Sequence, residues 1–298
     1  MDSLDLLAHR RKRSYFNWKR KIMPYVSLSS RACIVAALLA AICVGFADSV
    51  RAELIYGATD SSDLVSFDSA TPGTLTTIGA FSGLPNGQTI RGIDFRPATG
   101  QLYALSTSTP TPVAGTTAQL YTTDLVTGAL TAVGNRFTLA STTGLNAVAS
   151  LDFNPVDDTI RVVTGGGLNY HFNPVTGAMI SRDTDINPTG IITDIAYSNN
   201  TIGATSTTLY AYNYSTNMIG TVGSVGGSPN SPNSGQFTPI GSSGWFSNDA
   251  TVGFDISGAT GIGYINTNIT GAARDALFRV NLGTGAMTNI GNKLDIDV

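Results

Sequence analysis

Four aspartates recur at one place in a repeated pattern, and carboxylates are side chains that hold cations and move protons. They are Asp94, Asp152, Asp255 and Asp295, in segments that read GIDF, SLDF, GFDI and LDID. If these segments are the innermost strands of a ring, the carboxylates surround its centre, where a hard cation such as Ca²⁺ takes oxygen ligands. A repeated aspartate also suits a structural brace that accepts backbone N–H groups from the next repeat, and we favour that role.

A second group of polar side chains follows the spacing of a calcium loop only in part. Asp183, Asp185 and Asn187 alternate along the chain, and Asp194 lies eleven positions after the first. A calcium loop requires glycine where this chain has Pro188, so these three residues are the weaker metal candidates. We expect a chain without a bound cofactor, with Ca²⁺ as the alternative.

Candidates for acid–base catalysis are few. His171 is the only histidine, and Glu53 the only glutamate, after residue 52. We expect Glu53 to fray at the mature N-terminus and His171 to be a surface or hydrogen-bonded structural residue. With one histidine and no cysteine in this region, a zinc site is not expected. The sequence therefore assigns no catalytic residue.

Two adjacent aromatic residues are the candidates for contact with a ligand. Trp245 and Phe246 follow residues 219–236, which are rich in Gly, Ser, Pro and Asn and predict a mobile loop rather than a strand. Aromatic faces are frequent at binding sites. The same rings also suit a gap between repeats, and the sequence leaves both interpretations open.

The first 52 residues differ in composition from the remainder. A 16-residue apolar run, Ala32–Ala47, follows a basic segment and precedes the small-residue site Val50-Arg51-Ala52. The run is shorter than the roughly 20 residues of a membrane-spanning helix, so residues 1–52 are predicted to be a signal peptide. An uncleaved anchor is the alternative, and Met23 is an alternative start. The expected location is secreted, periplasmic or extracellular.

Removal of this leader leaves an acidic chain without cysteine. The leader holds nine of the 17 basic and three of the 20 acidic residues, so residues 53–298 keep 8 basic and 17 acidic residues, a net charge of −9. Nucleic acids and anionic membranes bind basic surfaces, so neither is an expected partner. We expect a monomer, stabilised by its core, that binds an unidentified small molecule, glycan or protein.

Five repeated units of about 40–60 residues predict that residues 53–298 form a single β-propeller domain. Each unit combines alternating apolar strands with turns, several of the form Asp/Asn-x-x-Thr-Gly, and almost no helix is expected. The strand-to-turn half recurs at Gly92–Leu105, Ser150–Val163, Asp194–Ser206 and Gly253–Ile265. A later strand, assigned as the third, recurs at Asp63–Gly79, Gln119–Gly134, Leu168–Ser181, Thr208–Asn217 and Ala276–Gly291. The pattern predicts an all-β fold of five four-stranded blades, with six blades as the alternative.

The two ends of this domain complement each other. The first unit, Glu53–Phe81, lacks the leading strand, while the chain ends with KLDIDV (Lys293–Val298) after its last complete unit. We expect this C-terminal strand to pair into the first blade, because that pairing closes the ring and removes an exposed sheet edge.

The segments GIDFRPATGQLY and DFNP, the Thr-Gly turns and the short terminal strand resemble a secreted bacterial family known as domain of unknown function 4394. The resemblance covers essentially all of Glu53–Val298. His171-Phe172 and Asp194 depart from the residues usual in that family. The resemblance implies an exported, propeller-like protein and assigns no catalytic residues.

These features favour an exported, non-enzymatic β-propeller that acts as a binding or interaction module. One alternative is an exported hydrolase or lyase that uses Asp residues at the central opening, and the other is a structural component of an envelope or matrix. The fold does not decide among them. Converging carboxylates in a deep pocket would favour the enzyme, and a shallow aromatic groove would favour the binding module.

Overall fold

The structure, a computed structural model, describes residues 52–59, 61–108, 116–139, 148–187, 190–269 and 275–294. Ala52–Val298 form one compact unit by themselves. Within the described residues, no helix has the length and apolar character needed to cross a membrane. The predicted signal peptide, apart from Ala52, and the alternative start at Met23 lie outside the described residues and stay predictions.

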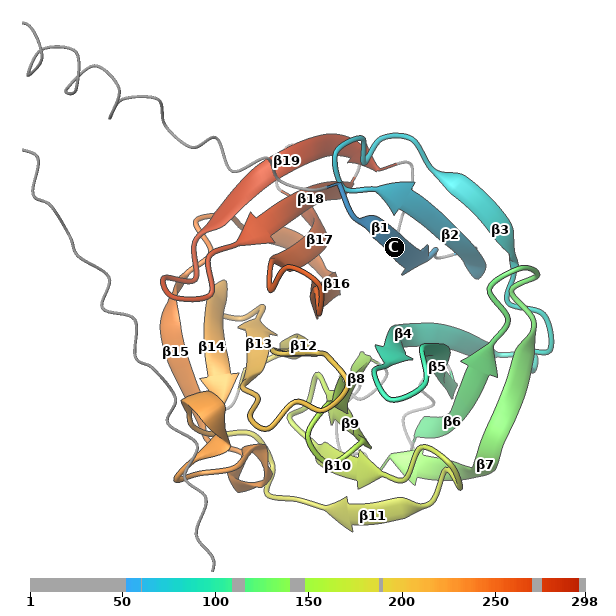
Figure 1. Cartoon of the computed structure of the whole chain (residues 1–298), viewed down its shortest axis with the longest axis horizontal. Coiled ribbons are helices and arrows are strands. Elements are labelled where there is room, and N and C mark those ends of the chain that lie inside the picture. Colours follow the sequence, from blue (N-terminus) through green and yellow to red (C-terminus); the bar gives the residue numbers. More distant parts are fainter. Residues whose placement is uncertain are drawn as a thin grey trace, which may run out of the picture. The chain divides into compact units, whose positions relative to one another are not determined.

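Five antiparallel sheets stand in a ring, so the prediction of a five-bladed, all-β propeller is confirmed and the six-bladed alternative is wrong (Figure 1). The first blade holds β1 (Leu54–Ala58), β2 (Asp63–Asp68) and β3 (Thr76–Ala80). The second holds β4 (Gln88–Arg96), β5 (Gln101–Ser108), β6 (Thr116–Thr123) and β7 (Leu130–Leu139). The third holds β8 (Ala149–Asn154), β9 (Thr159–Thr164), β10 (Asn169–Phe172) and β11 (Met179–Arg182). The fourth holds β12 (Ile192–Tyr197), β13 (Leu209–Asn213), β14 (Met218–Val222) and β15 (Phe237–Ser242). The fifth holds β16 (Ser247–Ile256), β17 (Gly263–Ile269), β18 (Asp275–Val280) and β19 (Met287–Leu294).

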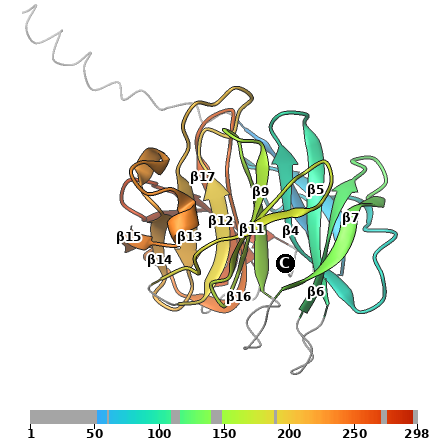
Figure 2. The same ribbon diagram turned by 90° about the horizontal axis from the view of Figure 1, so that it is seen from below.

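The innermost strands of four blades surround the centre of the ring. In Figure 1, β4, β8, β12 and β16 lie inside, and β3, β7, β11, β15 and β19 form the rim. Neighbouring inner strands contact each other from β4 through β8 and β12 to β16. Seen from the side, the inner strands run between two faces, with connecting loops at both (Figure 2). A residue type repeated on these strands is therefore brought together at the centre.

The hydrophobic core is divided among the interfaces between blades. Side chains alternate between the two faces of a strand, so each sheet presents one apolar face to each neighbouring blade. In the interface between the second and third blades, for example, the Tyr103 ring packs edge-on against Phe153 with a centroid distance of 5.0 Å. The Tyr103 hydroxyl also donates to the Pro174 carbonyl at 3.0 Å. Five such clusters, one for each pair of adjacent blades, occur among the described residues.

The described part of the first blade lacks an innermost strand, as the sequence predicts. Tyr56 on β1 pairs with Ser66 of β2, as Tyr103 on β5 pairs with Thr122 of β6, so β1 corresponds to the second strand of the other blades. Leu294 ends β19, where it lies opposite Asp275. The rest of the proposed closing strand, Asp295–Val298, lies outside the described residues, so closure by that strand stays a prediction.

The fourth blade differs from the predicted assignment. The sequence predicts Thr208–Asn217 as a third strand, but β13 pairs directly with β12, with Tyr212 opposite Asp194, and is the second strand. It predicts residues 219–236 as a loop, but β14 takes up Ile219–Val222 and pairs with β13. The assignment was wrong because second and third strands share the same apolar alternation, so periodicity alone cannot separate them.

The Asp/Asn-x-x-Thr-Gly turns have the predicted hydrogen bonds. Oδ1 of Asp124 accepts from the backbone nitrogens of the residues two and three positions later, at 2.9 and 2.8 Å. The same bonds occur at Asn173 and Asn281. The glycine that ends each turn has a positive φ, for example +65° at Gly177. The turn therefore rests on an Asx acceptor and on the backbone freedom of glycine.

Glu53, expected to fray, instead connects the first blade to the fifth. Its Oε1 accepts from Ser257 Oγ at 2.6 Å and from Thr260 Oγ1 at 2.9 Å, both in the β16–β17 connection. Its backbone nitrogen donates to Ser69 Oγ at 2.9 Å. The expectation was wrong because it considered only the position of Glu53 in the chain, whereas closure of the ring gives this residue partners 204 and 207 positions away.

Replacement of Glu53 by alanine should lower the free energy of unfolding by about 1–3 kcal/mol, because two hydroxyls lose a charged acceptor. Glu53→Gln, which keeps one acceptor oxygen, should cost less. The midpoint of urea unfolding measures both. Equal midpoints for the alanine variant and the wild type would show that these bonds do not stabilise the closure.

Candidate functional site

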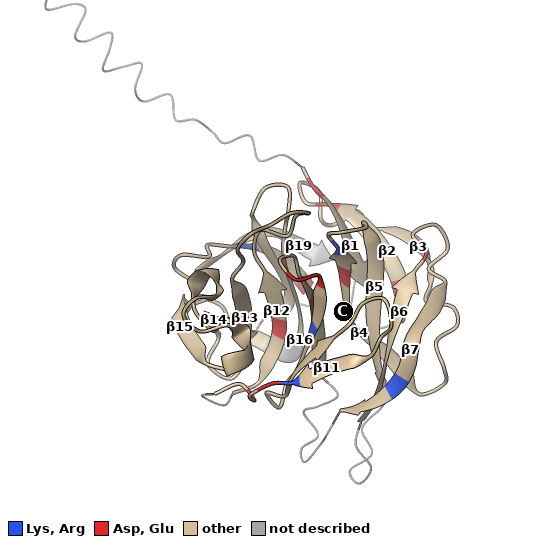
Figure 3. Ribbon diagram, turned by 60° about the horizontal axis from the view of Figure 1, so that its bottom comes forward, with Lys and Arg blue, Asp and Glu red and all other residues tan. Residues whose placement is uncertain are grey.

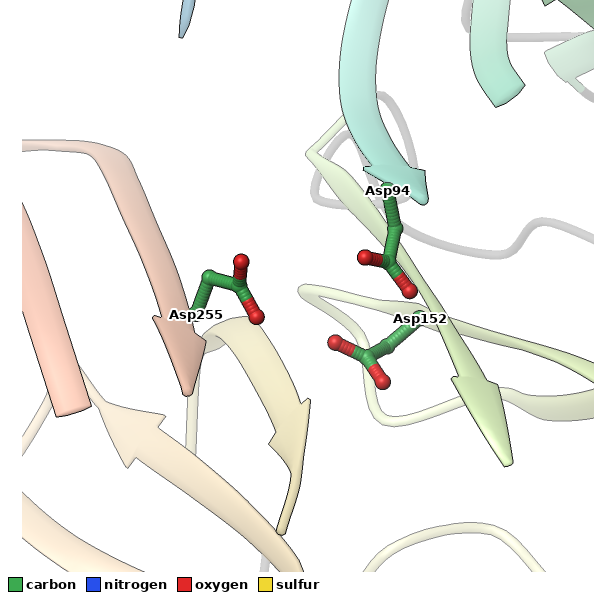
Figure 4. A group of neighbouring side chains, drawn as sticks. All are labelled: Asp94, Asp152 and Asp255. Atoms are coloured by element: carbon green, nitrogen blue, oxygen red, sulfur yellow. The ribbon is translucent and has the colours of Figure 1, made fainter. Parts of the chain in front are cut away.

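The centre of the ring gathers one aspartate from each of four blades. Asp94 lies on β4, Asp152 on β8, Asp194 on β12 and Asp255 on β16. Figure 4 shows Asp94, Asp152 and Asp255 pointing toward one another, and one carboxylate oxygen of each lies within 4.8 Å of the others. Asp94 and Asp152 are buried, whereas Asp255 keeps solvent-exposed surface. Asp295, the remaining position of the repeat, lies outside the described residues.

Three of these carboxylates also connect successive blades. The acceptors and donors are Asp94 Oδ2 with the Phe153 nitrogen at 2.7 Å, Asp152 Oδ1 with the Tyr197 nitrogen at 3.1 Å, and Asp194 Oδ2 with the Phe254 nitrogen at 2.7 Å. Each donor lies on the innermost strand of the next blade. These are bonds of the kind that the brace hypothesis requires, and they leave further lone pairs on the oxygens.

Asp194 belongs to this group, although sequence reasoning separated it. The sequence marks it as a departure from the family pattern and as the distant end of a calcium loop. In the repeated units Asp194 takes the place of Gly92, and Ala196 takes the place of Asp94, so the repeat gives no signal for Asp194. Its Oδ1 nevertheless accepts from the following backbone nitrogen at 2.8 Å, as Oδ1 of Asp94 does at 2.6 Å.

Burial and mutual repulsion make these carboxyls hold their protons. Burial raises the pKa of Asp94 well above its ordinary value, and the charge of Asp255 adds to the effect. Burial also raises the pKa of Asp152 and Asp194 well above the ordinary value, and that of Asp255 as well, although this side chain reaches solvent. A raised carboxyl pKa means that the folded state binds more protons than the unfolded state, so this contribution to stability falls as pH rises.

Negative charge dominates among the charges that act on these carboxyls. Those that act most strongly on the pKa values of the four aspartates are other acidic residues, namely one another and, for Asp255, Glu53. In Figure 3, acidic positions, in red, lie on inner strands such as β12, and basic positions, in blue, include β7 and β11 at the rim. Two arginines, Arg91 and Arg96, lie on the inner strand β4. Buried charges are costly unless they are paired or neutralised, so this centre suits protons or a cation.

The weaker metal candidates do not form a comparable cluster. Asp183 pairs with His171 at 2.7 Å and with Arg161 at 3.2 Å, while Asp185 pairs with Arg182 at 3.0 Å. Asn187 forms a β-bridge with Gln236, with the Asn187 nitrogen donating to the Gly235 carbonyl. Pro188 lies outside the described residues. Both carboxylates are thus engaged by positively charged or histidine side chains, which compete with a metal ion.

The two aromatic candidates have different surroundings. The Trp245 indole nitrogen donates to the Met287 carbonyl at 3.1 Å, and its ring packs against Phe278 with a centroid distance of 5.2 Å. Trp245 thus joins the fourth and fifth blades, as the gap-filling interpretation expects. Phe246 is 70 % exposed and Trp245 36 %, so Phe246 offers the larger exposed fraction to a ligand.

A second polar cluster, in the third blade, was not anticipated. Arg161 on β9 is 1 % exposed, and its guanidinium binds His171, Asn169 and Asp183 as well as two residues of the fourth blade. Sequence reasoning missed Arg161 because a lone arginine in an apolar strand has no local pattern. Its burial is permitted by the partners that surround it.

Solved structures similar to this chain are distant in sequence. A protein of unknown function from Bacteroides thetaiotaomicron is 12% identical with a TM-score of 0.46, and the match covers 82% of this chain and 58% of that one. TolB from Acinetobacter baumannii is 15% identical with a TM-score of 0.42, with 80% and 52% covered. This chain thus spans little more than half the length of these two proteins.

No curated protein matches this chain. The family model described as domain of unknown function (DUF4394) matches residues 63–296, which is most of the chain and includes every described strand except β1. The resemblance seen in the repeated segments is therefore confirmed, and this chain belongs to the DUF4394 family.

Proposed function

We propose that this chain is an exported, non-enzymatic binding module whose ring centre binds a hard divalent cation, Ca²⁺. One observation carries the proposal: a carboxylate oxygen from each of Asp94, Asp152 and Asp255 lies within 4.8 Å of the other two. Ca²⁺ takes six to eight oxygen ligands at about 2.3–2.6 Å, and oxygens on opposite sides of such an ion are separated by about twice that distance. The three carboxylates are thus close enough to share one ion.

The charge of the centre supports a cation as the ligand. Four aspartates from four blades meet there, and the charges that act most strongly on their pKa values are those of acidic residues. A divalent cation would relieve the repulsion that raises these pKa values, and it would have to displace protons. Ca²⁺ affinity should therefore increase with pH.

The same geometry favours binding over hydrolysis. Glycosidases separate their two carboxyl groups by roughly 5–5.5 Å or 6.5–9.5 Å, so that the bond to be cleaved fits between them. The oxygens at this centre are within 4.8 Å, and Asp94 and Asp152 are only 5% and 2% exposed. Carboxylates this close and this buried leave little room for a sugar. The carboxylates converge, as the enzyme alternative requires, but their burial leaves access for a small ion rather than for a sugar.

Export is proposed from the leader, and the proposal is tested separately. Cleavage after Val50-Arg51-Ala52 would make Glu53 the first residue of the mature chain. The contacts of its side chain with Ser257 and Thr260 would remain. Recovery of the protein outside the cytoplasm, with Glu53 found first by N-terminal sequencing, is the expected result. An intact leader on the exported protein would instead support the uncleaved anchor.

Calorimetry and thermal unfolding with CaCl₂, on protein first treated with a chelator, test the cation proposal. At a Ca²⁺ concentration 100-fold above the Kd, binding should stabilise the fold by about 2.7 kcal/mol. That corresponds to a rise in Tm of roughly 5–10 °C for a domain of this size. Asp255→Asn, which keeps an acceptor for the Ile256 nitrogen, should abolish most of the shift.

Two comparisons make the result specific. Asp124→Asn removes a carboxylate from an exposed turn and should leave the Ca²⁺ response unchanged. MgCl₂ should shift Tm less, because Mg²⁺ requires a near-ideal octahedron and dehydrates reluctantly. Absence of both heat and thermal shift with Ca²⁺ would leave the aspartates as proton-sharing braces and remove the proposal.

A further inference from the structure

A buried polar cluster, which we call the latch, ties the fourth blade to the third. It consists of Arg161, Asn169, His171, Asp183 and Asn233. Arg161 is its centre, with all five guanidinium N–H groups engaged. Its Nε donates to Tyr197 Oη at 2.7 Å. Its Nη1 donates to Asn169 Oδ1 and, at 3.2 Å, to Asp183 Oδ2. Its Nη2 donates to His171 Nε2 and, at 2.8 Å, to Asn233 Oδ1.

These contacts determine the protonation state of His171. The guanidinium of Arg161 only donates, so His171 Nε2 must accept from it and carries no proton. The ring proton is therefore on Nδ1, which lies 2.7 Å from Asp183 Oδ2 and donates to it. A second proton on Nε2 would place one N–H donor against another, that of Arg161 Nη2, and would place a positive imidazolium beside the positive guanidinium. The closed latch thus requires neutral histidine.

The charged groups around His171 agree with that assignment. Burial lowers the pKa of His171 from its ordinary 6.5, and the positive charge of Arg161 on β9 lowers it further. Asp183, which follows β11, and Asp157, in the β8–β9 connection, act in the opposite direction. Ser181 on β11 contributes an uncharged hydroxyl, 3.4 Å from Nδ1.

The latch holds the connection between β14 and β15, residues 223–236, against the third blade. Asn169 Nδ2 donates to the Pro232 carbonyl at 3.0 Å, in addition to the bond from Arg161 to Asn233 Oδ1. Two backbone bonds complete the attachment: the Thr184 nitrogen donates to the Asn233 carbonyl at 3.2 Å, and the Asn187 nitrogen donates to the Gly235 carbonyl at 2.8 Å. The guanidinium of Arg161 therefore links His171 to residues 223–236, because it binds both His171 and Asn233.

We propose that the latch is an acid-sensitive device in which protonation of His171 releases residues 223–236 from the third blade. A proton from solvent binds Nε2, and the hydrogen bond from Arg161 Nη2 is lost. Repulsion between imidazolium and guanidinium then displaces Arg161, which also leaves Asn233. Acidification strengthens the contribution of the ring centre to stability, because its carboxyl groups have raised pKa values. We therefore expect the release at low pH to be confined to the latch.

The direction with pH follows from linkage. When the latch opens, His171 becomes exposed and regains its ordinary pKa of 6.5, so the open form binds protons more readily than the closed form. The closed form is favoured above that pH and is progressively lost below it. When this chain meets mildly acidic surroundings after export, it would thus present a different surface at residues 223–236.

Hydrogen exchange combined with NMR of ¹⁵N-histidine, on the full chain at about pH 7.5 and about pH 5, tests the device. The chain has two histidines, His9 and His171, so the spectrum is simple to assign. We expect an Nδ1–H tautomer for His171 at the higher pH. On acidification, after correction for intrinsic rates, exchange at the Thr184 and Asn187 amides should increase about tenfold. The Gly128 amide, bonded to the Asp124 carbonyl in a turn without histidine, is the control and should not change.

A variant separates the device from ordinary support of the fold. His171→Gln remains uncharged and keeps an acceptor for Arg161, so exchange at Thr184 and Asn187 should become independent of pH. If that variant does not fold, the wild type still decides the question, because the His171 titration and the increase in exchange must share one midpoint. Titration of His171 without faster exchange, or release while His171 is still neutral, would overturn the proposal.

Discussion

Replacement of Arg161 by alanine should lower the free energy of unfolding by about 3–5 kcal/mol. The guanidinium is 1% exposed and donates to partners on β10 and β12, after β11 and in the β14–β15 connection, which belong to two blades. Without the guanidinium, Asp183 loses its ion pair with Arg161, although the Asp183 side chain is only 6% exposed. Asn169 Oδ1 and Asn233 Oδ1 lose their hydrogen-bond donor from Arg161. Buried acceptors without donors lose the hydration that they had in the unfolded chain.

The matched control is Arg182→Ala on β11, the outermost strand of the same blade. Arg182 also pairs with an aspartate, Asp185, at 3.0 Å, but both side chains are about half exposed. An exposed pair contributes roughly 0–1 kcal/mol, so this variant should unfold near the wild-type midpoint in urea. Similar losses for the two variants would mean that burial of Arg161 does not determine its contribution.

Gly177→Ala should be the second large effect, with a cost of about 2–5 kcal/mol. Gly177 ends the β10–β11 turn with φ +65°, where an L side chain is strained. A Cβ at this position would lie 2.3 Å from the Val133 carbonyl oxygen and 2.7 Å from its carbon, both in the backbone of the second blade. Backbone atoms cannot turn aside as a flexible side chain can, so the two blades must move apart.

Gly100→Ala isolates the steric part of this effect. Gly100 has nearly the same φ, +70°, in the β4–β5 turn, but no atom lies within 4 Å of a Cβ placed there. It should cost only the backbone strain, about 1–2 kcal/mol. Chemical denaturation of both variants gives the difference. If Gly177→Ala costs no more than Gly100→Ala, close contact between blades does not explain this glycine.

Much of the fold could be predicted from the sequence because a propeller repeats local information. Alternating apolar residues, Asx turns and positive-φ glycines recur in each unit, and each unit is read within a few dozen residues. The errors arose where the repeat is irregular. In the fourth blade a long connection, residues 198–208, separates β12 from β13, and the second strand then resembled the third strands of other blades.

The candidate site was predicted in part. Asp94, Asp152 and Asp255 could be placed on innermost strands from the repeat, and the structure brings their oxygens together. Asp194 could not be added from the repeat, because it lies two positions before the aligned site, which Ala196 occupies in the fourth blade. No local signal identifies Arg161, because its partners include residues 36 and 72 positions away in another blade.

The sequence by itself determined the five repeated units, the strand alternation, the Asx turns and the positions of Asp94, Asp152 and Asp255, because each depends on residues close together in the chain. The tertiary structure alone decided which blade meets which side chain. It gave Glu53 partners in the fifth blade and surrounded Arg161 with hydrogen-bond acceptors from two blades. It also brought the central carboxyls together, where burial and mutual repulsion raise their pKa values. Those outcomes depend on how separate sheets pack around one centre, and packing between blades has no period in the sequence.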